Sequence, residues 1–315
     1  MIRVVIVRVI AMLPVMLGVA VAAFFMIRLV PGDIVDALAA EELGNEVAEE
    51  ALRAAFGLDQ PIHVQFASWF GHLLTGDLGT SFRSGKPVLT EIIERFPLTL
   101  ELTVAAIVVS LLIAIPLGIL SATRRNGPLD VGARFVSLLG VSVPNFWLGI
   151  LLIALFAVVL RWLPSSGSND FEFSWDHFRF LILPALTLGT SLAAVTMRMT
   201  RSALLEVLKQ DYVRTARAKG LREWIVVTRH ALRNSLIPVI TIVGIQAGSL
   251  LGGTVVVEQV FSWGGLGSLV VQSIYQRDYP LLQGLVVFLA FFYLAVNLIV
   301  DIVYMYVDPR LRRHG

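Results

Sequence analysis

Long apolar runs, each about the length of a membrane-spanning helix, recur along the chain. A helix needs about 20 apolar residues to cross a hydrocarbon core of about 30 Å. The runs are too long for the strands of a membrane barrel, and lipid offers no hydrogen-bond partner to a free backbone amide, so the pattern predicts helices. The six runs lie approximately at Val9–Ile27, Leu98–Ala122, Phe135–Leu160, Phe180–Met197, Leu236–Val257 and Leu281–Tyr306.

The first run also has features of a cleavable signal peptide. Arg3 and Arg8 precede or begin it, and small residues occur at Ala20 and Ala22. However, the apolar stretch continues to Ile27, which is longer than the core of about 7 to 15 residues in a signal peptide. We therefore interpret it as a retained first helix.

Composition supports a membrane protein and argues against a soluble enzyme. Hydrophobic residues make up 57% of the 315 residues and charged residues 15%, against about 45 to 50% and about 25% in ordinary soluble domains. The mean hydropathy of +0.79 leaves too few polar side chains to cover a water-facing surface of that size. Cysteine is absent, which excludes disulfides, thiolate metal sites and thiol nucleophiles.

The scarce charges predict how the chain is oriented. With six crossings, both termini lie on one side of the membrane. Placing them in the cytoplasm puts most of the 25 Lys and Arg residues inside and most acidic residues outside, as the positive-inside rule requires. The resulting parts are the N-terminus with the first helix (1–30), an extracytoplasmic domain (31–97), a helical core (98–307) with a cytoplasmic loop at 198–235, and a cytoplasmic tail (308–315).

The predicted outer domain contains an acidic helical stretch, Asp33–Phe56, followed by a turn at Gly57–Pro61. The stretch is either a solvated helix face or a docking surface for an external partner. Gly79–Pro87 is the nearest match to a nucleotide-binding loop, but its glycine spacing is wrong and Pro87 replaces the required hydroxyl residue. The five histidines are interpreted as single surface residues, so no catalytic or metal site is predicted.

The cytoplasmic loop is patterned beyond the needs of a connector. Small residues are interspersed with charged ones just before a glycine, which predicts short helices ended by a glycine cap. Small residues would let another protein approach the helix backbone, and the charged residues would supply contacts around it. The candidate docking residues are Arg214, Thr215, Ala216, Arg217, Ala218, Lys219 and Gly220.

These residues resemble the coupling motif of bacterial ABC importer permeases, specifically the dipeptide, oligopeptide, glutathione and nickel permease family. RTARAKG aligns with the family's Glu-Ala-Ala, three variable residues and Gly, although Arg214, Thr215 and Arg233 depart from the general pattern. The resemblance covers essentially the whole chain. Further matching strings are GVSVPNFWLG at 140–149, GGTVVVEQVFSWGGLG at 252–267, RDYP at 277–280 and DPRLRR at 308–313.

The resemblance implies an all-α, polytopic type I ABC importer permease fold in the bacterial inner membrane. It implies half of a translocation pathway for di- or oligopeptides, with nickel or glutathione as alternative substrates. The chain would be no enzyme and bind no cofactor or metal, and no nucleic acid. Its implied partners are a second related permease, two cytoplasmic ATPases that bind ATP and Mg, and an external substrate-binding protein.

The competing class is a stand-alone secondary transporter. Such a protein would show inverted repeats and membrane-buried charge near the midplane. The sequence has no convincing internal repeat, and Asp301 is the single charge that we identify as a membrane-buried candidate.

Three features are candidates for the translocation path or the subunit interface. Gly244, Gly248 and Gly252 place a glycine stripe on one face of the fifth helix, for either a two-subunit interface or ordinary helix packing. Asp301 is either a substrate contact or a partner of Asn297 or a loop arginine. Pro144, with Asn145 after it, should loosen the third helix, as a gate or a packed kink.

Overall fold

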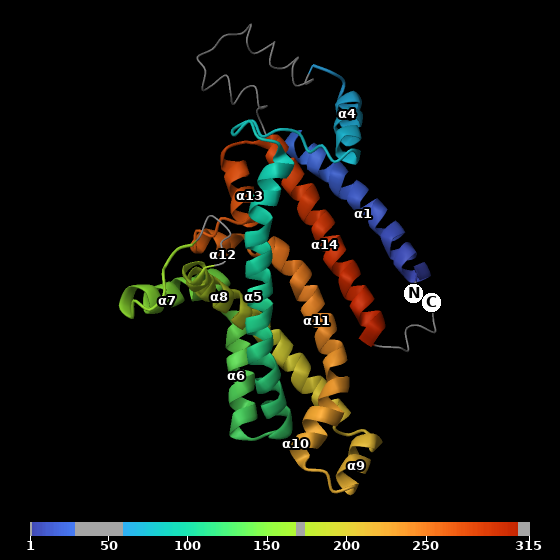
Figure 1. Cartoon of the computed structure of the whole chain (residues 1–315), viewed down its shortest axis with the longest axis vertical. Helices are drawn as coiled ribbons and strands as arrows, with labels where there is room; N and C mark the ends of the chain where they lie inside the picture. The colour runs from blue at the N-terminus through green and yellow to red at the C-terminus, as the bar shows by residue number, and fades with distance from the viewer. Residues whose placement is uncertain (1, 29–58, 168–173, 308–315) are drawn as a thin grey trace.

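The computed structural model describes residues 2–28, 59–167 and 174–307, and these residues are almost entirely helical (Figure 1). The acidic stretch Asp33–Phe56 and the DPRLRR string lie outside the described residues. Thr80 and Pro87 form an isolated bridge. In chain order the elements are α1 (Ile2–Arg28), α4 (Ile62–Leu74), α5 (Val88–Thr123), α6 (Pro128–Ser142), α7 (Asn145–Leu152), the π-helical η1 (Ile153–Val159), α8 (Trp175–Val207), α9 (Asp211–Ala218), α10 (Glu223–Ile225), the π-helical η2 (Val226–Ala231), α11 (Leu232–Gly253), α12 (Val255–Val260), α13 (Leu266–Tyr275) and α14 (Tyr279–Val307).

Five of the six predicted spans are confirmed as helices long and apolar enough to cross a membrane. They are α1, α5, α8, the run from α10 through α11, and α14. Several extend past the predicted apolar limits; α5, for example, begins at Val88, because helix formation continues into amphipathic turns beyond the apolar core.

The third predicted span, Phe135–Leu160, is present as a bent pair of helices and not as one straight helix. The chain breaks between α6 and α7, and the two halves are bent by 104°. Pro144 has no backbone N–H and disfavours helical geometry at the preceding residue, and Val143 accordingly adopts an extended conformation (φ −82°, ψ 123°). The sequence predicted a loosening at this proline, but not a sharp turn.

The long helices α5 and α8 pack along each other and carry most of the core. Glycines allow the close approach: a Cβ on Gly189 would lie 2.6 Å from the Val109 side chain, and one on Gly118 would lie 2.7 Å from Thr200. Each glycine thus allows α5 and α8 to pack closely, and a larger residue at either position would push the two helices apart.

One buried carboxylate fixes the loop between α4 and α5 to the rest of the chain. Asp278, in the RDYP string between α13 and α14, accepts a hydrogen bond from the Ser81 hydroxyl and longer ones from the backbone amides of Phe82 and Arg83. Only 1% of Asp278 is exposed. The loop between α4 and α5 is therefore fastened to the turn that begins α14.

Candidate functional site

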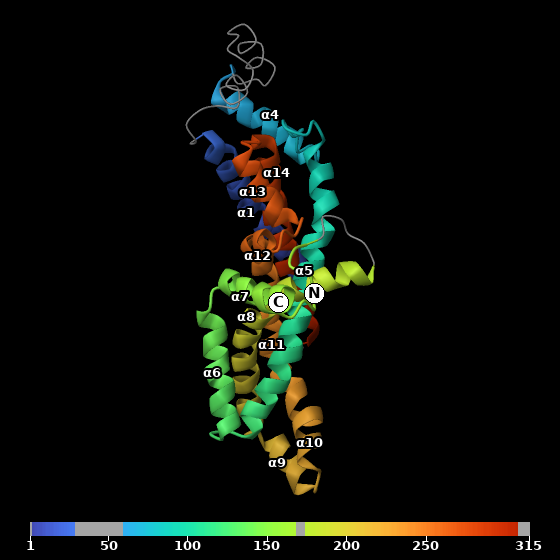
Figure 2. The same ribbon diagram turned by 90° about the vertical axis from the view of Figure 1, so that its left-hand side faces the viewer.

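The connection from α8 to α11 forms the end of the molecule opposite α4. Figures 1 and 2 both place α9 and α10 at this extremity, beyond the turn that joins α5 to α6. A segment that projects in this way is accessible to a partner. It contains all seven candidate docking residues.

α9 is a two-turn helix that ends in a glycine, as predicted. The helix stops at Ala218, and Gly220 follows with φ +76°, a left-handed conformation that side-chain-bearing residues rarely adopt. The Gly220 N–H donates to the Arg217 carbonyl at 2.9 Å, so the turn satisfies one of the last backbone acceptors of the helix. Glycine is therefore required here for backbone geometry.

One face of α9 is buried against its own chain. Val213 is fully buried and Ala216 is 6% exposed, one turn apart on the same side of the helix. They join a core cluster that includes Ala122 of α5 and Leu204 of α8, together with η2 side chains. Ala216 therefore does not offer its small side chain to a partner, which corrects the prediction for that residue.

The opposite face of α9 is open. Arg214, Thr215, Ala218 and Lys219 are exposed, and Arg214 makes a loose contact of 3.5 Å with the equally exposed Asp211. This face presents a small residue, a hydroxyl and two cations. Such a surface suits a partner that brings acidic or hydrogen-bonding groups close to the helix.

Arg217 is used within the chain. Its Nη2 and Nε donate to the two carboxylate oxygens of Glu223, at 2.7 and 3.1 Å, across the Gly220 turn. Donation to Glu223 raises the pKa of the Arg217 guanidinium above its ordinary value. Asn234 also donates to the Tyr212 hydroxyl at 2.8 Å, so both ends of α9 are tied to the α10–α11 arm.

The glycine stripe of α11 packs mainly against α14 of the same chain. A Cβ on Gly244 would lie 2.3 Å from the Val300 side chain, and one on Gly248 would lie 3.0 Å from the Tyr293 ring. Gly252 faces open space. Ordinary helix packing therefore accounts for Gly244 and Gly248, and only Gly252 remains available to a second subunit.

Asp301 pairs with Arg8 rather than with Asn297 or a loop arginine, which corrects the predicted partner. The Arg8 Nη1 and Asp301 Oδ2 atoms are 3.1 Å apart, and 36% of the Asp301 side chain is exposed. Asn297 instead donates to the Tyr293 carbonyl at 3.0 Å. The ion pair joins α1 to α14, which run side by side (Figure 1).

Pro144 and Asn145 lie at the break between α6 and α7. Pro144 is exposed and Asn145 is half-buried. The next two rings, Phe146 and Trp147, are 47% and 49% exposed, so the break is not packed inside this chain.

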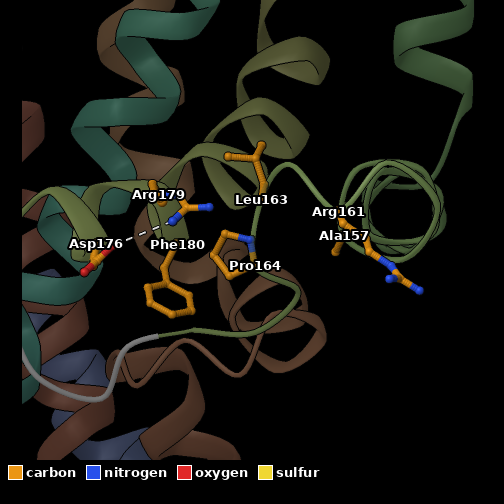
Figure 3. Close-up of a pocket in the computed structure, with 7 residues that line it drawn as sticks. All are labelled: Ala157, Arg161, Leu163, Pro164, Asp176, Arg179 and Phe180. Atoms are coloured by element: carbon orange, nitrogen blue, oxygen red, sulfur yellow. Dashed lines mark ion pairs between the residues drawn. The ribbon is translucent and has the colours of Figure 1, made fainter.

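A cavity of about 450 Å³ lies between η1 and the start of α8 (Figure 3). Among its described lining residues, Asp176 and Arg179 form a loose ion pair at 3.7 Å, and the Asp176 side chain is 83% exposed. The Arg161 guanidinium points away from Pro164 and Phe180. The charged groups thus do not converge on one point, and within the described ranges no cluster of acidic or histidine side chains could hold a metal ion.

Sequence reasoning missed the buried polar groups of His177, Glu258 and Asp130. His177, treated as a surface histidine, is 6% exposed, and its Nε2 lies 2.7 Å from a Glu101 carboxylate oxygen of α5. Glu258 is fully buried and accepts hydrogen bonds from the Thr99 and Thr254 hydroxyls and the Ser268 amide, at 2.9 to 3.1 Å.

The third group is Asp130, which is fully buried against Arg201 of α8. Position in a matching string was the only signal for Glu258, within GGTVVVEQVFSWGGLG. His177 and Asp130 carried none, since their partners are far away in the chain.

Comparison with known families gives matches along almost the whole chain. Residues 114–313 match the family described as binding-protein-dependent transport system inner membrane component, and residues 1–103 match the N-terminal part of such membrane components. Only residues 104–113, within α5, separate the two matches.

Three relatives illustrate the similarity. The dipeptide transport system permease protein DppB of Alkalihalophilus pseudofirmus is 38% identical over 97% of this chain and 98% of its own length. The glutathione transport system permease protein GsiC of Salmonella typhi is 44% identical, over 97% of each chain. The oligopeptide transport system permease protein AppB of Bacillus subtilis is 42% identical, over 96% of this chain and 97% of its own.

Among solved structures, a chain of the MetNI methionine ABC transporter in an inward-facing conformation has the same fold, with a TM-score of 0.57. The match covers 69% of this chain and 96% of that one, at 20% identity. At that identity the likeness bears on the fold alone.

Proposed function

The chain belongs to the family of binding-protein-dependent transport system inner membrane components, and we propose that it forms half of the translocation pathway of an ATP-driven importer of di- or oligopeptides. The substrate proposal rests on relatives that are 38 to 44% identical over nearly their full length and are named for dipeptide, oligopeptide and glutathione transport. Glutathione is itself a small peptide and is the second candidate.

The observation that carries the ATP-driven mechanism is the geometry of α9. It projects from the membrane helices, one face is anchored on the ends of α5 and α8, and the other face is open. A partner ATPase that binds the open face of α9 would move the adjoining ends of α5 and α8 together. ATP and Mg would bind to that partner, and this chain would hold no cofactor.

The complete importer would contain a second related permease, two ATPases and an extracytoplasmic binding protein. Both termini and α9 would lie in the cytoplasm of a bacterial cell, with α4 on the outer side. Most basic residues then face inward, which follows the positive-inside rule.

Reconstitution of the full complex in proteoliposomes tests the function. We expect uptake of a labelled di- or oligopeptide that requires both ATP inside the vesicles and the binding protein outside. Glutathione and Ni²⁺ serve as parallel substrates, and transport of either one alone would reassign the cargo. Flux through vesicles that contain only this chain would instead support a stand-alone transporter.

Orientation is testable because the chain has no cysteine of its own. Lys219→Cys, on the exposed side of α9, should react with an impermeant maleimide only after the cells are opened. Thr75→Cys, at the end of α4, should react in intact spheroplasts. The reverse pattern would overturn the proposed orientation.

A further inference from the structure

Asp130 and Arg201 form a buried two-point ion pair next to the site where α9 rests on the membrane helices. Arg201 Nε and Nη2 donate to the two carboxylate oxygens of Asp130, at 2.7 and 2.9 Å. Asp130 is fully buried and the Arg201 side chain is 18% exposed. Such a pair is held in one geometry, because the buried carboxylate has no water to hydrogen-bond in place of Arg201.

Three helix ends converge on the Asp130 carboxylate. Arg201 belongs to α8, and Asp130 stands in the first turn of α6. The Ser121 hydroxyl, near the end of α5, donates to one oxygen, and the Asn126 amide, in the α5–α6 turn, donates to the other at 2.9 Å. One carboxylate thus connects α5, the turn, α6 and α8.

The Asp130–Arg201 pair adjoins the core cluster in which Val213 and Ala216 of α9 are buried. Ala122, which packs in the α9 cluster, follows Ser121, and Leu204 is one helical turn after Arg201. A force applied to α9 is therefore delivered to α5 and α8 next to the residues that fasten both helices to α6. No cluster residue belongs to α6, so the cluster itself does not hold this helix.

α6 is the helix that leads to the break at Val143–Pro144. Along its length it is held to α8 by the Ser137 hydroxyl, which donates to the Ala194 carbonyl at 2.7 Å, and by the close approach of Gly140 to Ala194. If the inner end of α6 is fastened, movement of α8 carries α6 with it and displaces the start of α7. If it is loose, sliding of α8 past α6 is opposed by the Ser137 hydrogen bond and by packing, but no longer by the ion pair.

We propose that Asp130 and Arg201 are positioning residues for transport: their ion pair makes α5, α6 and α8 move as one unit, so that motion of α9 reaches the α6–α7 break. The inference rests on the proposed function, since it assigns a transmission role within that importer. The role assigned to them is one of positioning and involves no contact with substrate or nucleotide. Their effect is on how motion at α9 is converted into a change of the pathway.

The test uses the full complex with Asp130→Asn, Arg201→Lys and the double variant Asp130→Asn/Arg201→Gln. For each, the amount of assembled complex, binding-protein-stimulated ATP hydrolysis and peptide uptake are measured. We expect assembled complexes that still hydrolyse ATP, with uptake per complex reduced about tenfold, within the usual range of coupling between sites. Uptake that falls only in proportion to the assembled amount would overturn the proposal.

A disulfide between α6 and α8 separates a role in transmission from a role in folding alone, because only a transmission role predicts that cross-linking restores uptake. Because the chain lacks cysteine, Gly140→Cys/Ala194→Cys can be added to the double variant. A Cβ at 140 would lie 3.1 Å from the Ala194 Cβ, so a small outward shift of α6 brings the two to the Cβ–Cβ separation of about 3.5 to 4.5 Å found in disulfides. Oxidation should restore uptake and reduction should abolish it again. Unchanged uptake after complete cross-linking would mean that fastening α6 to α8 is not the function of the pair.

The wild-type complex separates the two levels of failure. If it shows no ATP-dependent uptake of any peptide, the proposed function fails. If it transports peptide and the Asp130 and Arg201 variants transport equally well per complex, only the transmission role fails.

Discussion

Arg217 and Glu223 face each other across the Gly220 turn and are joined by two hydrogen bonds, the shorter of 2.7 Å. Their side chains are 40% and 60% exposed. A pair that is open to water to this extent contributes about 1 kcal/mol or less to stability. Its consequence is geometric, because it sets the direction in which α9 leaves the α10–α11 arm.

Arg217→Gln should therefore reduce coupling with little loss of stability. We expect an unfolding midpoint within a few degrees of the wild type, and binding-protein-stimulated ATP hydrolysis reduced several-fold, as for typical coupling energies. The reversed pair Arg217→Glu/Glu223→Arg should recover part of the stimulation. Unchanged stimulation in Arg217→Gln, with a loss in the exposed neighbour Arg214→Gln, would show that coupling depends on the open face of α9 and not on the Arg217–Glu223 pair.

Gly220→Ala should impair coupling through backbone strain alone. An added Cβ meets nothing within 4 Å, yet φ is +76°, and a left-handed conformation costs a residue with a side chain about 1 to 2 kcal/mol. Gly85→Ala is the matched control, because Gly85 has φ +69° and the same open surroundings in the loop before α5. ATP hydrolysis and uptake should fall for Gly220→Ala only; equal losses would assign the effect to general strain.

Gly244→Leu should lower the amount of folded protein, because the new side chain would collide with Val300 of α14. Overpacking of this kind costs about 1 to 3 kcal/mol or more. Gly252→Leu, in open space on the same helix, should leave the amount of folded protein unchanged. Solubilised protein measured by size-exclusion chromatography compares the two, and a reversed order would contradict the packing assignment.

The open position of Gly252 also tests the predicted subunit interface. If the second permease approaches α11 there, Gly252→Leu should reduce co-purification of that partner while this chain stays folded. Undiminished co-purification would remove the last glycine of the stripe from the interface.

Asp301→Asn should transport peptide at the wild-type rate per assembled complex. Asp301 is engaged with Arg8 at 3.1 Å, which is the arrangement of a helix-to-helix anchor. Asp301→Asn and Arg8→Gln should each loosen the packing of α1 slightly and to the same extent, as measured by protease protection of the N-terminal segment. Loss of uptake for Asp301→Asn but not for Arg8→Gln would restore a substrate role.

Features that depend on neighbouring residues were predictable. Apolar runs of membrane length predicted six spans, and five of them are single long helices, since lipid forces such a run to satisfy its own backbone groups. The short helix that ends before Gly220 was also predictable from local sequence, because glycine adopts left-handed backbone geometry more readily than other residues.

Features that depend on packing were not. Whether Ala216 faces a partner or its own core is decided by where α5 and α8 end, and nothing in RTARAKG specifies this. The glycine stripe predicted a close approach but not its partner, which is α14. The proline at 144 predicted a weak point, whereas the 104° bend depends on the helices around α6 and α7.

The sequence by itself thus determined the membrane class, the number of apolar runs, the glycine-capped projecting loop and the family. The tertiary structure decided which faces are free and which charges meet. Asp130 and Arg201 are 71 residues apart, and their meeting requires three helices to pack in one arrangement. Local patterns encode the conformation of a segment, but a buried ion pair between distant segments exists only once those helices are packed.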